Sequence, residues 1–202
     1  MAHYYYLGAQ LPHLVFGQNP PMSSEAFKLL AREMMNSADA AMLNFCTLDP
    51  DPIPEDAIIE NEPENSSYLK PASRTSSSLI NRWKEWERSL RLNLARDRAV
   101  KLKREPGNAP DSPMEAVTAA KHAMTIESPL EAEIFLDKSR WDAIESFIGI
   151  DIFSESAIYA YLLKLLLMER RTGFLVGEGF EEYRNLYDNI LGSTNISLQD
   201  PD

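Results

Sequence analysis

The residue types that most often carry out chemistry are few and widely spaced in this chain. The histidines are His3, His13 and His122, and none of them forms the His-x-x-x-His pair that brings two imidazoles to one helical face for zinc. Cys46 ends an apolar stripe and has no basic residue within several positions to lower its pKa. We therefore expect surface or packing roles for the histidines and a small buried thiol at Cys46.

Carboxylates are more numerous, and helical-bundle enzymes use them to hold metals. Glu131, Glu133 and Asp137 lie close together, but the Glu-x-x-His motif of di-metal bundles is missing. Glu131 and Glu133 fall in the first turn of an expected helix, where negative charge is favourable against the helix dipole. The acidic stretch 49–56 resembles a calcium loop only in its acidity, because it contains prolines and lacks a glycine. We expect no metal ion at either place.

Nucleotide-binding patterns are missing as well. The chain contains neither Gly-x-x-x-x-Gly-Lys-Ser/Thr nor Gly-x-Gly-x-x-Gly, and Gly173, Gly177 and Gly179 do not follow an expected strand. No spacing points to a catalytic triad. We therefore expect no cofactor and no catalytic activity, and these patterns identify no small-molecule substrate.

Length and charge further limit the classes of protein to which this chain could belong. The 202 residues, 44% hydrophobic and 25% charged, suit one large domain over 1–202. A net charge of −11 argues against a general nucleic-acid binder and against binding to anionic lipid by overall charge. One cysteine cannot form an internal disulfide, and the first residues lack the basic start and apolar run of a secretory leader. We expect a cytoplasmic protein.

One segment departs strongly from this acidic average. Residues 82–104 contain nine basic and three acidic residues, a net charge of +6, which leaves −17 for the rest of the chain. In one interpretation this basic helix packs against the protein's own acidic surface, with residues 55–64 as one source of counter-charge and with Trp83 and Trp86 facing inward. In the other, part of the helix binds an acidic partner protein, because arginine and tryptophan are frequent contact residues in interfaces. The candidate partner-binding residues are Arg88, Arg91, Arg96, Arg98, Lys101, Lys103 and Arg104.

Apolar residues at steps of three and four predict the helices that would position this segment. The pattern predicts helices over 27–45, 77–104, 130–147, 158–168 and 180–191. The remaining parts are expected to be a short extended or single-turn element over 1–16, a flexible loop over 49–75 and a polar tail over 193–202. The predicted fold class is mainly α: a helical bundle or orthogonal array of five to six helices with a short N-terminal extended element.

Local signals mark several helix boundaries. Ser112-Pro113-Met114-Glu115 and Ser128-Pro129-Leu130-Glu131 each place serine at the cap, proline at the first helical position and glutamate at the third. Pro106-Gly107 and Gly149 are expected to stop helices, and Ser154 to begin one. The segment 158–168 is apolar nearly all round, but about 11 residues are too few for the ~20 needed to cross a bilayer. It predicts a central buried helix and no membrane insertion.

Several short motifs stand out along the chain on either side of residues 46–75. They are Tyr4-Tyr5-Tyr6-Leu7 with Leu11-Pro12, Trp83-x-x-Trp86-Glu87 with Leu90-Arg91, Arg98-Ala99-x-Lys101-Leu102, Pro129-Leu130-Glu131-Ala132-Glu133, and Leu136-Asp137 with Arg140-Trp141-Asp142. Together they resemble a bacterial protein family encoded within V-type ATPase operons, notably in spirochaetes and Bacteroidetes.

The resemblance implies a cytoplasmic accessory or central-stalk-like component of a rotary ion-translocating ATPase, peripheral at the inner face of the plasma membrane through that complex. Its size and helical character are similar in kind to the longer subunit called C in archaeal-type and d in eukaryotic complexes. The implied partners are stalk or membrane-ring subunits, and no catalytic residues are implied. Two other functions remain open: an independent soluble helical adaptor or regulator, and a small helical enzyme with a site assembled from distant acids.

Overall fold

The structure, a computed structural model, describes residues 3–50, 75–106 and 111–172. This part is mainly helical, as expected, and its regular elements are α1 (Tyr5–Gln10), α2 (Ser24–Met34), α3 (Ser37–Met42), the 3-10 turn η1 (Leu43–Phe45), α4 (Ser78–Lys101), α5 (Met114–Ala123), α6 (Pro129–Ile148) and α7 (Glu155–Thr172). The described ranges contain no strand, only an isolated antiparallel bridge between His3 and Ser154. The expected helix over 180–191, the tail over 193–202 and nearly all of the loop over 49–75 lie outside the described residues.

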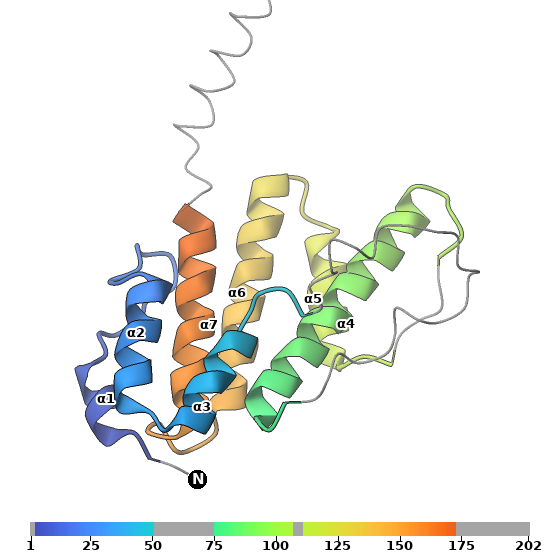
Figure 1. The fold of residues 1–202 in the computed structure, drawn as a ribbon. Helices are drawn as coiled ribbons and strands as arrows, with labels where there is room; N and C mark the ends of the chain where they lie inside the picture. The colour runs from blue at the N-terminus through green and yellow to red at the C-terminus, as the bar shows by residue number, and fades with distance from the viewer. Residues whose placement is uncertain (1–2, 51–74, 107–110, 173–202) are drawn as a thin grey trace, which may run out of the picture.

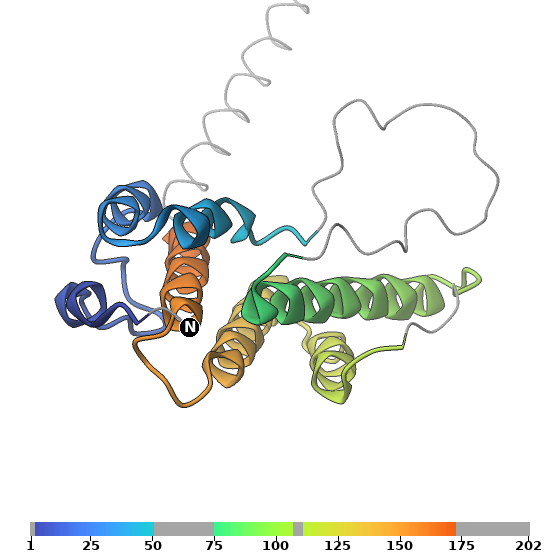
Figure 2. The ribbon, with the colours of Figure 1, turned by 60° about the horizontal axis from the view of Figure 1, so that its bottom comes forward.

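Helix α7 is the centre of the fold, as its apolar sequence predicts. It packs against α2, α4 and α6, so it lies between the N-terminal helices and the α4–α5–α6 group (Figures 1 and 2). Eight of its residues are buried: Ile158, Tyr159, Ala160, Leu162, Leu163, Leu165, Leu167 and Met168. No helix in the described ranges is both long and apolar enough to span a membrane.

The N-terminal region follows one of two predicted alternatives and differs from the prediction in another place. Of the short extended or single-turn element expected over 1–16, the described residues form the short helix α1, which buries Leu7 and brings Gly8 against Phe153 so closely that a Cβ would lie 2.9 Å from that ring. The single helix expected over 27–45 is broken after α2, because Asn36 caps α3 by accepting a hydrogen bond from the Asp39 amide at 2.8 Å. The prediction of one continuous helix was therefore wrong.

Helix α4 is the long helix predicted over 77–104, but it ends at Lys101 and not at Pro106-Gly107. Lys103 has a left-handed backbone, with φ of 55°. The Lys103 amide donates to the Val100 carbonyl at 3.0 Å, and the Arg104 amide donates to the Ala99 carbonyl at 2.9 Å. These two bonds form a Schellman motif, which stops a helix without any help from glycine or proline here.

The two helix N-termini predicted from a serine-proline pair differ in the structure. Ser128 caps α6 as predicted, accepting from the Glu131 amide at 3.3 Å, and Gly149 ends that helix with φ of 79°. Ser112 does not cap α5: its hydroxyl accepts from the Asn93 side chain at 3.0 Å, and Pro113 takes the cap position without a side-chain bond. The capping prediction for Ser112 was wrong, since α5 begins only at Met114 and the Ser112 hydroxyl contacts α4.

The buried face of α6 also differs from the expected one. Leu130 and Ile134 were predicted to face inward but are exposed. Asp137 and Arg140 are buried instead, next to Trp141 and Ile144 on the same face. Two charged side chains therefore enter the interior, which a purely apolar pattern does not predict.

Candidate partner-binding surface and a neighbouring pocket

Charged side chains of three helices meet inside the protein. Glu87 of α4 is 0% exposed and accepts hydrogen bonds from Arg140 Nε at 2.9 Å, Arg140 Nη2 at 3.2 Å and Arg91 Nε at 2.8 Å. Asp137 of α6 accepts from Arg140 Nη1 at 3.1 Å and from Arg170 of α7. We call Glu87, Asp137, Arg140 and Arg170 the buried charge cluster.

Neighbouring carboxylates act on the Arg140 guanidinium at the centre of this cluster. Burial by itself would lower the pKa of Arg140, but Glu87, Asp137 and Glu133 together raise that pKa above its usual value. Every charge in the cluster has an opposite partner, and its ion pairs connect α4, α6 and α7. The expected apolar face of α6 did not include the cluster. The available signal was the Asp137 and Arg140 pair, three residues apart on a face that also holds Leu136 and Trp141.

Arg91 belongs to this internal network, although it was predicted to bind a partner. Besides its bond to Glu87, its Nη1 donates to Asp49 Oδ1 at 2.9 Å and its Nη2 donates to the Leu48 carbonyl at 2.9 Å. Arg88 also makes an interaction within the protein. The structure thus places these two of the seven candidates in contacts of the chain itself.

The other five candidates lie together at the last turns of α4 and just beyond it. We call Arg96, Arg98, Lys101, Lys103 and Arg104 the basic end of α4. Within the described ranges no ion pair joins any of them to a carboxylate. All but the half-buried Arg96 are exposed.

Apolar side chains accompany these cations. Val100 and Leu102 are 56% and 64% exposed, between the basic residues of the same segment. Two shallow hollows of about 170 and 290 Å³ adjoin each other here, since Lys101 and Met124 line both. Lys121 of α5 adds a further cation to the second hollow, while Glu133 lines the first and Asp97 the second. The surface therefore combines positive charge with apolar contact area, which is the composition of a protein interface.

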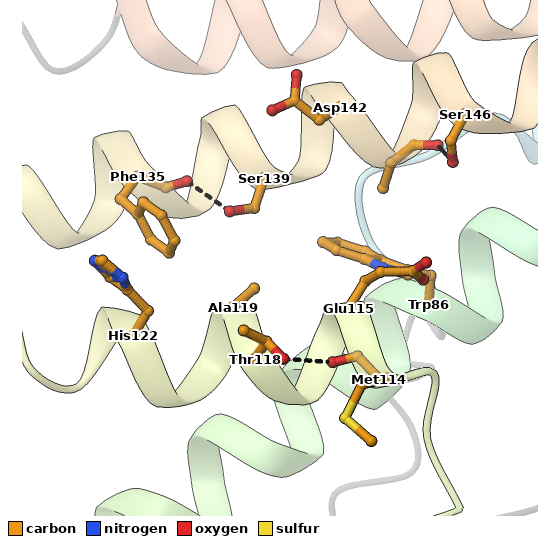
Figure 3. A pocket seen from close by; sticks show the side chains of 11 residues that line it. Trp86, Met114, Glu115, Thr118, Ala119, His122, Phe135, Ser139, Asp142 and Ser146 are labelled. Atoms are coloured by element: carbon orange, nitrogen blue, oxygen red, sulfur yellow. Dashed lines mark hydrogen bonds between the residues drawn. The ribbon is translucent and has the colours of Figure 1, made fainter.

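A larger pocket lies between α5 and α6 (Figure 3). Its volume is about 480 Å³, and Trp86 of α4 lines it together with residues of both other helices. At one end the rings of His122 and Phe135 stack with their centroids 4.4 Å apart. This pocket could not be predicted from the sequence, because its walls come from three separate helices and share no motif.

The histidines and the cysteine do not assemble into a site in the described part of the chain. Cys46 is buried, as predicted, and burial raises the pKa of its thiol to about 12. His3 Nδ1 lies 2.8 Å from Asp151, far in sequence from the stacked His122. No group of three or more metal-ligating side chains in the described ranges is arranged to hold a metal ion.

Comparisons with known proteins find no matching protein family, no matching curated protein and no matching solved structure. The resemblance to proteins of V-type ATPase operons therefore depends on the sequence motifs alone.

Proposed function

We propose that this protein is a non-catalytic accessory or central-stalk-like subunit of a bacterial V-type ATPase and that it acts by protein–protein docking. The observation that carries the proposal is the basic end of α4. Its five cations have no carboxylate partner in the described residues and surround exposed Val100 and Leu102. The resemblance to the operon family supplies the identity of the complex.

The charge distribution supports an acidic partner. The chain as a whole carries −11, so five cations that lie together and form no ion pair among the described residues are a local concentration of positive charge on an acidic protein. Such a field accelerates the encounter with an acidic surface and selects against basic ones. Stalk or membrane-ring subunits that present acidic segments are the proposed partners, and they would hold the protein at the inner face of the plasma membrane.

The backbone at Lys103 gives independent support. A left-handed conformation costs a residue with a Cβ roughly 1–2 kcal/mol, and glycine is the usual residue at this position of a Schellman motif. The protein has a lysine there in spite of this cost. A requirement for positive charge at this position accounts for that choice.

The test is affinity purification of the tagged protein from its native organism, with identification of the co-purifying subunits at increasing salt. The triple variant Lys101→Gln/Lys103→Gln/Arg104→Gln should fold, lose about 1 kcal/mol of stability or less, and recover less ATPase as salt rises. A matched triple variant, Lys28→Gln/Arg32→Gln/Lys138→Gln, removes the same charge from α2 and α6 and should recover as much as the wild type.

Two outcomes would contradict the proposal. Equal recovery of ATPase subunits with both triple variants would assign the basic end of α4 to helix stability alone. If the wild-type protein brings down no ATPase subunit but a different acidic protein, then the protein is an independent adaptor that uses the same surface.

A further inference from the structure

The three tryptophans differ in what their indole N–H groups contact. Trp83 donates to the Thr47 carbonyl at 2.8 Å, and Trp141 donates to Glu145 at 3.0 Å. Trp86 is 3% exposed, yet its N–H has no hydrogen-bond partner in the described part of the chain. A buried indole normally has a partner, because an unpaired donor loses its water without compensation. Trp86 is therefore a donor that a bound molecule could satisfy.

This donor belongs to a pocket of suitable size. Figure 3 shows the Trp86 indole extending from α4 into the space between α5 and α6. The pocket volume of about 480 Å³ lies within the usual range for small-molecule sites. The small side chains of Ala119 and Ala143 leave space for a ligand between the helices. The stacked His122 and Phe135 rings provide a flat apolar surface at one end of the pocket.

The charge of the lining indicates the ligand class. The residues that line the pocket include Glu115 and Asp142 but no lysine or arginine. Asp142 already pairs with Lys138, which lies one turn earlier on α6. Glu115 has no ion pair within the described ranges. The carboxylate left without a partner favours a cationic group on the ligand.

We propose that this pocket binds a small organic amine with a flat apolar body and a carbonyl oxygen. In the bound state the ammonium group lies beside Glu115, the apolar body lies between α5 and α6, and the carbonyl accepts from the Trp86 N–H. The proposal is independent of the docking function, because it uses none of the residues at the basic end of α4.

The test is titration of the full-length protein with L-phenylalaninamide, which carries all three groups. The readout is the indole N–H signals of the three tryptophans in a proton–nitrogen correlation spectrum, assigned with single Trp→Phe variants. We expect the Trp86 signal to move with a saturating curve while the Trp83 and Trp141 signals stay in place. Two related probes, 3-phenylpropanamide without the ammonium and phenethylamine without the carbonyl, should bind about tenfold more weakly.

Variants of the two carboxylates provide the matched comparison. Glu115→Gln should weaken L-phenylalaninamide about tenfold, to the level of 3-phenylpropanamide, whereas Asp142→Asn should change binding by less than threefold because Asp142 is already paired. Both residues are exposed, so neither change threatens the fold.

Three results would overturn the proposal. The first is a Trp86 signal that does not respond to L-phenylalaninamide up to the limit of its solubility. The second is equal binding of 3-phenylpropanamide together with no effect of Glu115→Gln, which would remove the selectivity for amines. The third is a shift of the Trp86 signal in the free Glu115→Gln protein, which would mean that Glu115 itself accepts from the indole.

Discussion

Helix α4 carries charged residues along its whole length, but its two halves hold them in different surroundings. In the first half, Glu87 is fully buried and both of its oxygens accept hydrogen bonds from arginines. In the second half, Arg98 and Lys101 line a hollow with Glu133 and several apolar residues, yet they form no ion pair with a carboxylate among the described residues. The boundary lies just after Arg91, which reaches both Glu87 and Asp49.

This difference separates charges that stabilise the fold from charges that remain available for contact with another molecule. A buried ion must be paired, because the loss of hydration costs several kcal/mol per charge. An exposed cation on a solvated helix end needs no partner for stability. Charge count along a helix therefore does not separate these two roles, and the division between paired and unpaired charges tells which cations remain available for a partner.

The largest effect should come from the buried charge cluster. Replacing Arg140 by methionine would leave Glu87 and Asp137 buried without their shared cation, and we expect a loss of about 3–5 kcal/mol in the free energy of unfolding. Urea denaturation followed by circular dichroism measures this. The control Arg98→Met, on the exposed half of α4, should change stability by less than about 0.5 kcal/mol. Similar losses of stability for Arg140→Met and Arg98→Met would mean that the two halves of α4 do not differ in how their charges affect stability.

The second prediction is that Arg91 stabilises the fold and does not bind the partner. Arg91→Gln removes one of the cations that Glu87 contacts and the link to Asp49 and Leu48. Because its side chain is 43% exposed, we expect a loss of about 1–2 kcal/mol, less than for Arg140. Recovery of ATPase subunits, corrected for folded protein, should equal that of the wild type. If Arg91→Gln recovers fewer ATPase subunits but keeps the stability of the wild type, Arg91 belongs to the partner-binding surface.

Long helices with a continuous apolar spacing could be predicted from the sequence. Helix breaks and caps that depend on contacts with other helices could not. The apolar spacing of α4 and α7 and the cap at Ser128 indicated these helices directly. The break at Asn36 depends on more than a local cap, since its side-chain amide also donates to the Tyr4 hydroxyl at 2.8 Å. Ser112 repeats the local pattern of Ser128, yet its partner lies on another helix. Such exceptions follow from contacts that exist only after the helices have packed.

The candidate surface could be predicted only in part for the same reason. Net charge identified residues 82–104 as the basic segment, and the basic end of α4 is within it. The separation of Arg91 from Arg98 depends on Asp49, which is 42 residues away in sequence from Arg91. The buried charge cluster requires the docking of Glu87 with Arg140 across 53 residues. No spacing along one helix reveals either contact.

The third prediction compares two tryptophans of the first half of α4, Trp83 and Trp86. Both are buried, so Trp→Phe costs packing energy at each position. Trp83→Phe also loses the bond to the Thr47 carbonyl and leaves that acceptor unpaired, whereas Trp86→Phe loses no hydrogen bond. We expect Trp83→Phe to be more destabilising by about 1 kcal/mol in urea denaturation. Equal losses would mean that the Trp86 N–H has a partner in solution.

The smallest effect concerns Lys103, which lies just beyond α4 and has a left-handed backbone that costs stability. Lys103→Gly should relieve the left-handed backbone and raise the free energy of unfolding by about 0.5 kcal/mol, because part of the gain is offset by the entropy of glycine. Lys103→Ala removes the same charge but keeps the Cβ, so it should bring no such gain. Both variants should recover less ATPase at raised salt, and to the same extent. If alanine stabilises as much as glycine, the backbone at Lys103 is not strained. If both variants recover as much ATPase as the wild type, the lysine is not held there for docking.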